Sequence, residues 1–406
     1  MIYIHVPFCK SFCVYCAFYS ELCPADGASR QELFVKSLLD EIRLRRSEIE
    51  RNPGPDTLYI GGGTPSVLPP GLLRTIVRAL PPGVGRDEFT IEVNPDDIVS
   101  RGEEYIRELR GLGVNRVSMG VQSFDDGILR WMRRRHDASA AIRAMGMLRR
   151  CGVQNISLDL IFGIAGLSTQ TLRDTLSKAL ELRPEHISAY QLSLDEDSDL
   201  DVMVQKGQYS PMDDETCREQ YGLICETLAQ AGYRHYEISN WALPGREAVH
   251  NSAYWRRVPY VGLGAGAHSF DGTRRRWNSA MTPDGNWSPA EEVLTEEDVR
   301  VETIMLGLRT ADGLDAAWLE AATDAGILAE LRRRGALVPV DGQTCSEGAV
   351  LQRCGPPAPA NPPRDGAPMP GKPPVPAADA VFRPPLRFRI PEDHFFVSDD
   401  IISSII

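Results

Sequence analysis

The sequence predicts an α/β protein with an incomplete (β/α)6 barrel, followed by a smaller and mainly helical C-terminal domain. Short apolar, β-branched runs alternate with helical patterns at intervals of roughly 30–40 residues, which is typical of parallel strands buried on both faces. Six such units are complete by about residue 210, too few for a closed eight-unit barrel. An open, doubly wound sheet is the alternative. In either arrangement, functional side chains should gather at the carboxyl ends of the strands.

The six expected strands are Tyr3–Pro7, Thr57–Ile60, Phe89–Val93, Arg116–Gly120, Ile156–Ile161 and His186–Leu192. Helical patterns lie between them. After the first strand, Ser29-Arg30-Gln31-Glu32 has the form of a capping box, and Phe34, Leu38 and Ile42 follow at helical spacing. Repeated βα units of this kind predict parallel strands joined by right-handed crossovers.

The rest of the chain divides by composition. Residues 1–210 hold the six units, 211–294 form a barrel-closing segment, and 295–406 begin with the capping sequence Thr295-Glu296-Glu297-Asp298. Gly355–Pro385 holds 12 of the 30 prolines, which predicts a flexible and dispensable insertion. Order should return with a strand at Arg387–Ile390. A final helix at 401–406 should follow, capped by residues 398–400.

The composition also limits the kinds of partner that the chain is expected to bind. The chain has 44 Lys and Arg against 56 Asp and Glu, a net charge of −12, which argues against nucleic-acid binding. We find no apolar run of about 18 residues and no basic leader before an apolar stretch, so a cytoplasmic location is expected.

The first feature with chemistry is a group of three cysteines, Cys9, Cys13 and Cys16, directly after the first strand. The chain has nine cysteines, and this odd count in an intracellular context favours metal or redox chemistry over disulfides. Structural zinc sites usually take four ligands, and Cys23 is the candidate for a fourth. An iron–sulfur cluster held by three thiolates would leave one iron open, and the spacing favours it. Incidental buried cysteines are the third interpretation.

The C-x3-C-x2-C spacing, with Tyr15 before the last cysteine, resembles the radical S-adenosylmethionine (SAM) superfamily. Gly61-Gly62-Gly63-Thr64-Pro65 after the second strand is similar to the glycine-rich SAM-binding motif of that superfamily, with Thr64 in place of the usual acid. The resemblance implies that Cys9, Cys13 and Cys16 bind a [4Fe-4S] cluster whose open iron chelates SAM, with Tyr15 near the adenine.

Further segments resemble the oxygen-independent coproporphyrinogen III oxidase family, namely residues 91–95, 118–124 and 159–163 at the ends of expected strands. Carried over residue by residue, this resemblance implies SAM contacts from Tyr3, Tyr15, Gly62, Gly63, Thr64, Glu92, Gln122, Arg134 and Asp159. These residue types suit the ligand, since carboxylates accept from ribose hydroxyls or an ammonium group and arginine binds a carboxylate.

Two departures favour the HemW-type haem chaperone branch of that family. The oxidases carry one more cysteine, two positions after the third, where this chain has Phe18, and they also have an N-terminal extension. In addition, His250-Asn251-Ser252-Ala253-Tyr254-Trp255 resembles the H-N-x-x-Y-W motif of the chaperones. The resemblance implies haem binding by His250, Tyr254 and Trp255, with imidazole as an axial ligand and aromatic rings on the porphyrin. His268, in a glycine-rich strip, is a possible second ligand, although a structural role is more usual.

The resemblance therefore implies a haem chaperone with one [4Fe-4S] cluster, SAM and haem as cofactors. Its partner would be an acceptor haem protein, for instance a respiratory, membrane-associated one, and a homodimer stays open. One alternative is coproporphyrinogen III dehydrogenase, a radical-SAM decarboxylase, against which Phe18 and the absent extension count. Another is a different radical-SAM enzyme, such as one that modifies RNA. Whether SAM is cleaved is left open, because all three functions share the cofactors.

Overall fold

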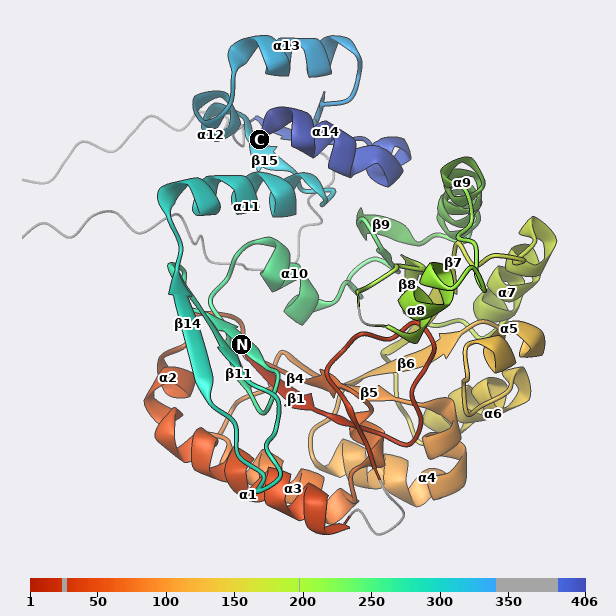
Figure 1. Cartoon of the computed structure of the whole chain (residues 1–406), viewed down its shortest axis with the longest axis vertical. Helices are drawn as coiled ribbons and strands as arrows, with labels where there is room; N and C mark the ends of the chain where they lie inside the picture. The colour runs from red at the N-terminus through yellow and green to blue at the C-terminus, as the bar shows by residue number, and fades with distance from the viewer. Residues whose placement is uncertain (24–27, 197, 341–385) are drawn as a thin grey trace, which may run out of the picture.

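The computed structural model describes residues 1–23, 28–196, 198–340 and 386–406 (Figure 1). The predicted proline-rich insertion at 355–385 lies outside the described residues. A large curved sheet forms the centre of the molecule, with helices along its outer face (Figure 1).

Six parallel strands lie side by side in chain order and make up most of this nine-stranded sheet. They are β1 (Ile2–Val6), β4 (Thr57–Gly62), β5 (Glu88–Val93), β6 (Arg116–Gln122), β7 (Ile156–Phe162) and β8 (His186–Gln191). Each end lies within two residues of the predicted one, so the predicted (β/α)6 arrangement is confirmed. The strand order also excludes the doubly wound alternative, in which the order would reverse at a switch point.

Three short strands extend the sheet at its two edges. β11 (Val261–Leu263) pairs in parallel with β1, while β10 (Asn240–Ala242) pairs antiparallel with β8 and with β9 (Arg234–Glu237). β11 and β9 are the two ends of the strand order, so the barrel is incomplete. Sequence reasoning missed these strands because three or four residues are too few to display a strand period.

Several of the helices that connect the strands start at side-chain caps. Asn94, Asp137, Ser168 and Asp213 each accept a backbone N–H at the start of their helix. The predicted capping box at 29–32 is wrong, because the first helix begins at Ala28 and Ser29 lies inside its first turn. The helices of this region are α1 (Ala28–Leu44), α2 (Arg46–Arg51), α3 (Pro70–Ala79), α4 (Pro95–Gly111), α5 (Asp126–Trp131), α6 (Ala138–Arg150), α7 (Thr169–Glu181), α8 (Asp199–Gln205), α9 (Asp214–Gln230) and α10 (Val249–Trp255), with a 3-10 turn η1 (Pro65–Val67).

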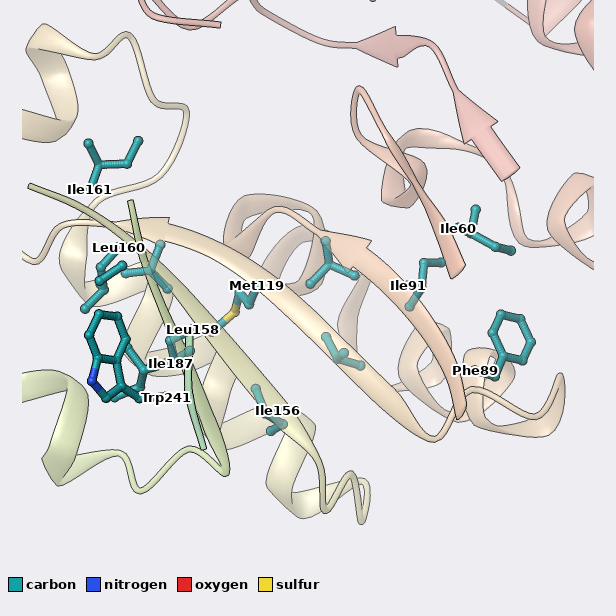
Figure 2. Packing of buried hydrophobic residues seen from close by; sticks show 14 of the residues in the cluster. Ile60, Phe89, Ile91, Met119, Ile156, Leu158, Leu160, Ile161, Ile187 and Trp241 are labelled. Carbon is teal, nitrogen blue, oxygen red and sulfur yellow. The ribbon is translucent and has the colours of Figure 1, made fainter. Parts of the chain in front are cut away.

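The hydrophobic core follows the sheet. Figure 2 shows side chains of neighbouring strands, among them Ile91, Met119 and Leu158, packed beside one another, with Trp241 at one end of the row. Met119, Leu158 and Trp241 are fully buried. Burying each such side chain contributes about 1.5–3 kcal/mol, so this core fixes the positions of the strand ends.

Two smaller sheets complete the chain. β12 (His268–Phe270), β13 (Arg274–Asn278) and β14 (Pro289–Val293) form an antiparallel sheet next to β11, and β2 (Phe8–Cys9) pairs with β3 (Glu21–Leu22). Nowhere in the described ranges does a helix combine the length and apolar character needed to cross a bilayer.

The C-terminal part is mainly helical and contacts the β9 edge of the large sheet, where the N–H of Ala311 donates to the carbonyl oxygen of Tyr236 at 3.0 Å (Figure 1). The capping box of Thr295 and Asp298 is present as predicted. The predicted cap at Ser398 is wrong, because the last helix already includes this residue and no side chain caps it. The elements are α11 (Glu296–Leu308), α12 (Ala316–Ala322), α13 (Ala325–Arg333), η2 (Glu392–Val397) and α14 (Ser398–Ile405), with a sheet of β15 (Leu314–Asp315), β17 (Arg387–Arg389) and β16 (Val338–Pro339).

Candidate functional site

The cysteine segment lies at the carboxyl ends of β1 and β4. Sγ of Cys9 stands 3.4 Å from Oγ1 of Thr64, and Arg134 Nη1 donates to Sγ of Cys13 at 3.3 Å. The backbone N–H of Cys16 donates to the carbonyl oxygen of Cys13 at 3.3 Å. The structure thus brings the three cysteines together with two of the predicted SAM contacts.

The three thiols are partly buried. Within the described residues, no three His, Cys, Asp or Glu side chains surround a common point as ligands of a single metal would. Burial raises the pKa of the Cys16 thiol to about 11 and also raises the pKa of Cys9. Such thiols become thiolates when a metal binds them.

The glycine turn after β4 packs against the cysteine segment. The N–H of Gly63 donates to the carbonyl oxygen of Val6 at 2.9 Å, and that of Thr64 to the carbonyl oxygen of Phe8 at 2.8 Å. A Cβ added at Gly63 would lie 2.8 Å from the Phe8 oxygen and 3.1 Å from Sγ of Cys9. Only glycine therefore allows this close approach, which fits a backbone that cradles a ligand beside the cysteines.

Two carboxylates extend the site into the barrel. Glu92 accepts from the Tyr59 hydroxyl at 2.7 Å and from the Gly62 N–H at 3.1 Å. Asp159 accepts from the Ser118 hydroxyl at 3.1 Å. Burial raises the pKa of Glu92 to about 7 and the pKa of Asp159 to about 6. Half-buried carboxylates that accept no hydrogen bond from a cation among the described residues are suited to a ligand that brings a positive charge or hydroxyl groups.

Three further predicted residues lie around these groups. Gln122 has a φ of 68°, unusual for a residue with a side chain, and lies close to Arg134 across Gly120. Arg134 donates to the Gly120 carbonyl oxygen, and its Nε is buried with no hydrogen-bond partner among the described residues. That orphaned donor fits a carboxylate ligand. Tyr15 is half-buried, packed against the core.

Tyr3 is engaged within the protein. Its hydroxyl lies 3.0 Å from Nδ1 of His5, whose Nε2 lies 2.8 Å from the carbonyl oxygen of Tyr19. His5 was missed by sequence reasoning because it lies inside a buried strand, where a histidine gives no separate signal. The pair links the start of β1 to the chain that follows the cysteines.

Asp97, also missed, connects the segments of the site. Its fully buried carboxylate accepts from Lys10 Nζ at 2.7 Å, from the Ser66 hydroxyl at 2.8 Å and from Arg135 Nη2 at 3.0 Å. Burial alone would raise the pKa of Asp97, but the bonds from Arg135 and the other donors hold it below its usual range. Lys10 lies between Cys9 and Cys13, Ser66 follows the glycine turn, and Arg135 follows Arg134. One acid therefore holds three loops together.

The H-N-x-x-Y-W segment lies at the opposite end of the barrel. Nδ1 of His250, on α10, is 2.8 Å from Oγ1 of Thr57, the first residue of β4. The N–H groups of Val249 and His250 donate to Glu88, the first residue of β5, at 2.8 and 3.3 Å. The cysteine end of β4 is about 16 Å away, at roughly 3.3 Å per residue.

The haem-binding role of His250 stays a prediction, and in this structure its imidazole lies inside the protein. Its side chain is fully buried, and Nε2, the second ring nitrogen, lies 3.0 Å from the Tyr254 hydroxyl. Burial lowers the pKa of His250 to about 3. The Tyr254 ring packs on Tyr260 with ring centroids 4.7 Å apart, and Trp255 is half-buried at the end of α10. The motif thus packs against the amino ends of β4 and β5.

Comparisons with known proteins agree with this architecture. The Radical SAM superfamily matches residues 3–179. "Heme chaperone HemW" of Lactococcus lactis is 33% identical over 323 residues, covering 77% of this chain and 82% of that protein. The Bacillus subtilis protein of the same name is 34% identical over 327 residues, with 77% and 84% covered.

The likeness extends to animal proteins and to a solved structure. The mouse "Radical S-adenosyl methionine domain-containing protein 1, mitochondrial" is 31% identical over 335 residues, covering 77% of this chain and 74% of that protein. Coproporphyrinogen III oxidase (HemN) from Escherichia coli superposes with a TM-score of 0.68 over 83% of both chains, at 21% identity. This last likeness supports the fold of the barrel and of the part that follows it.

Proposed function

Because this chain belongs to the HemW family of radical SAM proteins, we propose that it binds haem and passes it to acceptor haem proteins. The observation that carries the proposal is the extent of the similarity. The superfamily match ends at residue 179, whereas the similarity to proteins named heme chaperone covers 77% of the chain, well beyond the SAM-binding half. Many proteins with different functions share the same scaffold, so the similarity outside that scaffold is the part that points to a particular function.

A radical SAM protein holds a [4Fe-4S] cluster and SAM, and the proposed cluster ligands here are Cys9, Cys13 and Cys16. The cluster would supply an open iron to the amino and carboxylate groups of SAM. Arg134 is proposed to bind the SAM carboxylate with its unpaired donor, Glu92 the amino group and Asp159 the ribose hydroxyls. The remaining proposed SAM contacts are Tyr3, Tyr15, Gly62, Gly63, Thr64 and Gln122.

Phe18 supports the chaperone over the decarboxylase. It occupies the position of the additional cysteine of the oxidases, and its side chain is 74% exposed. A phenylalanine cannot replace a thiol in redox or ligand chemistry.

The test is a haem titration of anaerobically reconstituted protein, followed by the Soret band. We expect saturation near one haem per chain, and transfer of that haem to an apo acceptor protein in a second step. Binding that never saturates would contradict the proposal. A coproporphyrinogen III decarboxylation assay on the same sample should give no product, and product formation would favour the enzyme instead.

A further inference from the structure

A cleft of about 370 Å³ lies between the first strands of the large sheet and the small antiparallel sheet. Its walls come from α2, from the chain around Asn52, from the start of β11 and from β12, β13 and β14. Asn52 accepts a hydrogen bond from the amino group of Met1 at 2.9 Å, which places this wall at the amino end of β1. The cleft therefore lies at the same end of the barrel as the H-N-x-x-Y-W segment, whose His250 contacts the first residue of β4.

The guanidinium groups of the cleft are only partly neutralised by the protein. The arginines that line it are Arg45, Arg51, Arg274 and Arg276. Arg45 forms ion pairs with Glu41 and Glu48, and Arg274 lies 3.9 Å from the carboxylate of Glu291. Arg51 and Arg276 have no carboxylate within 4 Å among the described residues, so their charges are free for a ligand.

Arg276 has donors that the protein leaves unused. It projects from the same face of β13 as Arg274, two residues before it, and its side chain is half-buried. Its Nε is buried with no hydrogen-bond partner among the described residues. Arg51 donates only from its Nε, to the carbonyl oxygen of Ser47 at 3.0 Å. Unpaired guanidinium donors in a cleft are suited to an anion, and above all to a carboxylate, which matches the fork of N–H groups.

The acids of the cleft do not cancel this positive charge. Glu48, Asp271 and Glu291 line it. Glu48 accepts two hydrogen bonds from Arg45, at 3.0 and 2.8 Å, and Asp271 accepts from the backbone N–H groups of Thr273 and Arg274 at 2.9 and 2.8 Å. Four guanidinium groups against three carboxylates leave a local positive excess, in a chain whose net charge is −12. Such an excess favours a negatively charged ligand.

Tyr260 connects the cleft with the H-N-x-x-Y-W segment. It lines the cleft, and its ring packs on that of Tyr254 with centroids 4.7 Å apart. Its backbone also pairs with Phe270, a second lining residue, through hydrogen bonds of 2.8 and 3.0 Å. A ligand bound at Tyr254 therefore lies next to the cleft. The cleft volume is near the lower end of the range of about 300–1,000 Å³ for ligand pockets, which suits the side chains of a porphyrin and not its macrocycle.

We propose that this cleft binds the carboxylate side chains of haem, with Arg276 and Arg51 as the principal donors. This inference rests on the proposed function. It leaves the iron and the macrocycle to the H-N-x-x-Y-W segment and assigns to the cleft the charged edge of the porphyrin. Hydrogen bonds from a guanidinium fork to a carboxylate fix orientation as well as adding affinity, so the cleft would also set which way the porphyrin faces.

The experiment compares titrations of haem with titrations of haem dimethyl ester, in which both carboxylates are blocked, on the wild type, Arg276→Ala and Arg51→Ala. We expect each variant to bind haem about tenfold more weakly than the wild type, because charge-assisted hydrogen bonds are lost. The ester should bind more weakly than haem to the wild type and equally to all three proteins. Arg46→Ala is the matched control. Arg46 begins the helix that Arg51 ends, bonds Glu50 at 2.8 Å and does not line the cleft, so this variant should titrate like the wild type.

Two outcomes would overturn the inference. If the ester binds the wild type as tightly as haem does, or if the variants weaken both ligands equally, the cleft does not hold the carboxylates of haem while the proposed function stands. That result would also be expected of a cleft that holds a free anion. If the wild type binds neither ligand saturably, the proposed function fails and the inference fails with it. Thermal unfolding checks the variants, which should keep the wild-type midpoint because neither arginine has a carboxylate partner.

Discussion

Asp97 accepts a hydrogen bond from Nζ of Lys10 at 2.7 Å, although 87 residues separate the two in the chain. The side chain of Asp97 is fully buried, and that of Lys10 is 40% exposed. The contact holds the segment between Cys9 and Cys13 against the start of α4. The geometry of the cysteines therefore depends on an acid that touches none of them.

Asp97→Asn should destabilise the protein and impair cluster assembly. Removing one partner of a fully buried ion pair costs about 3–5 kcal/mol. The cost here should be smaller, because Lys10 is 40% exposed and Arg135 keeps its bond to Asp96. We expect a lower urea midpoint for the cluster-free protein and less iron per chain after reconstitution. Asp96→Asn is the control, since Asp96 bonds Arg135 from a side chain that is 40% exposed and should contribute about 0–1 kcal/mol. Equal iron contents in the two variants would argue against the role given to Asp97.

Gly63→Ala should disrupt the site more than the fold. The added Cβ would meet the Phe8 carbonyl oxygen at 2.8 Å, so the glycine turn and the cysteine segment must separate. We expect the iron–sulfur absorption after reconstitution to fall several-fold. Gly71→Ala on α3 is the matched control, because a Cβ there meets nothing within 4 Å and alanine favours a helix by about 0.5–1 kcal/mol. A Gly63→Ala variant that takes up iron like the wild type would show that the close approach is not needed.

Cys13→Ser and Cys23→Ser should differ sharply in iron content. The sulfur of Cys13 accepts a hydrogen bond from the Arg134 guanidinium, and Cys13 is one of the proposed cluster ligands. Cys23 instead accepts from Nε2 of Gln31 at 3.1 Å, which occupies its sulfur within the protein. We expect cluster absorption to be lost in Cys13→Ser and kept in Cys23→Ser. Two results would favour the zinc alternative. One is loss of bound metal in both variants, and the other is a wild-type protein that holds zinc through four thiolates.

Glu92 should make the cluster-free protein less stable as the pH rises. Its pKa is raised by burial, from an ordinary value of 4.5 to about 7, so the folded state binds the proton more tightly than the unfolded state. The stabilisation is fully present below pH 4.5 and is lost as the pH rises through about 7, a change of about 3 kcal/mol. Glu92→Gln should flatten this part of the profile, measured by urea unfolding between pH 5 and 8. A variant with the wild-type profile would assign the dependence to other groups.

The six central strands were predictable because each is an apolar run long enough to show its pattern, as in Ile156–Phe162. The site was only partly predictable. Asp97 stands in the first turn of a helix, where acids are common for reasons of the helix dipole, so its hydrogen bonds left no separate trace in the sequence. The motif around His250 could be recognised in the sequence, but the sequence did not indicate at which end of the barrel its residues pack. That position depends on contacts with Thr57 and Glu88, which are distant in sequence.

The pairing of β16 with β17 has a consequence for engineering. Val338 faces Arg389 across this antiparallel pair, and the N–H of Val340 donates to the Arg387 carbonyl oxygen at 2.8 Å, so the residues on both sides of positions 341–385 meet as the arms of a hairpin. A two-residue turn such as Asn-Gly could join these arms directly. Replacing a connection of 45 residues by so short a one reduces the entropy lost on closing the loop, worth about 2 kcal/mol or more. The same junction offers a place to insert a reporter domain whose ends lie close together.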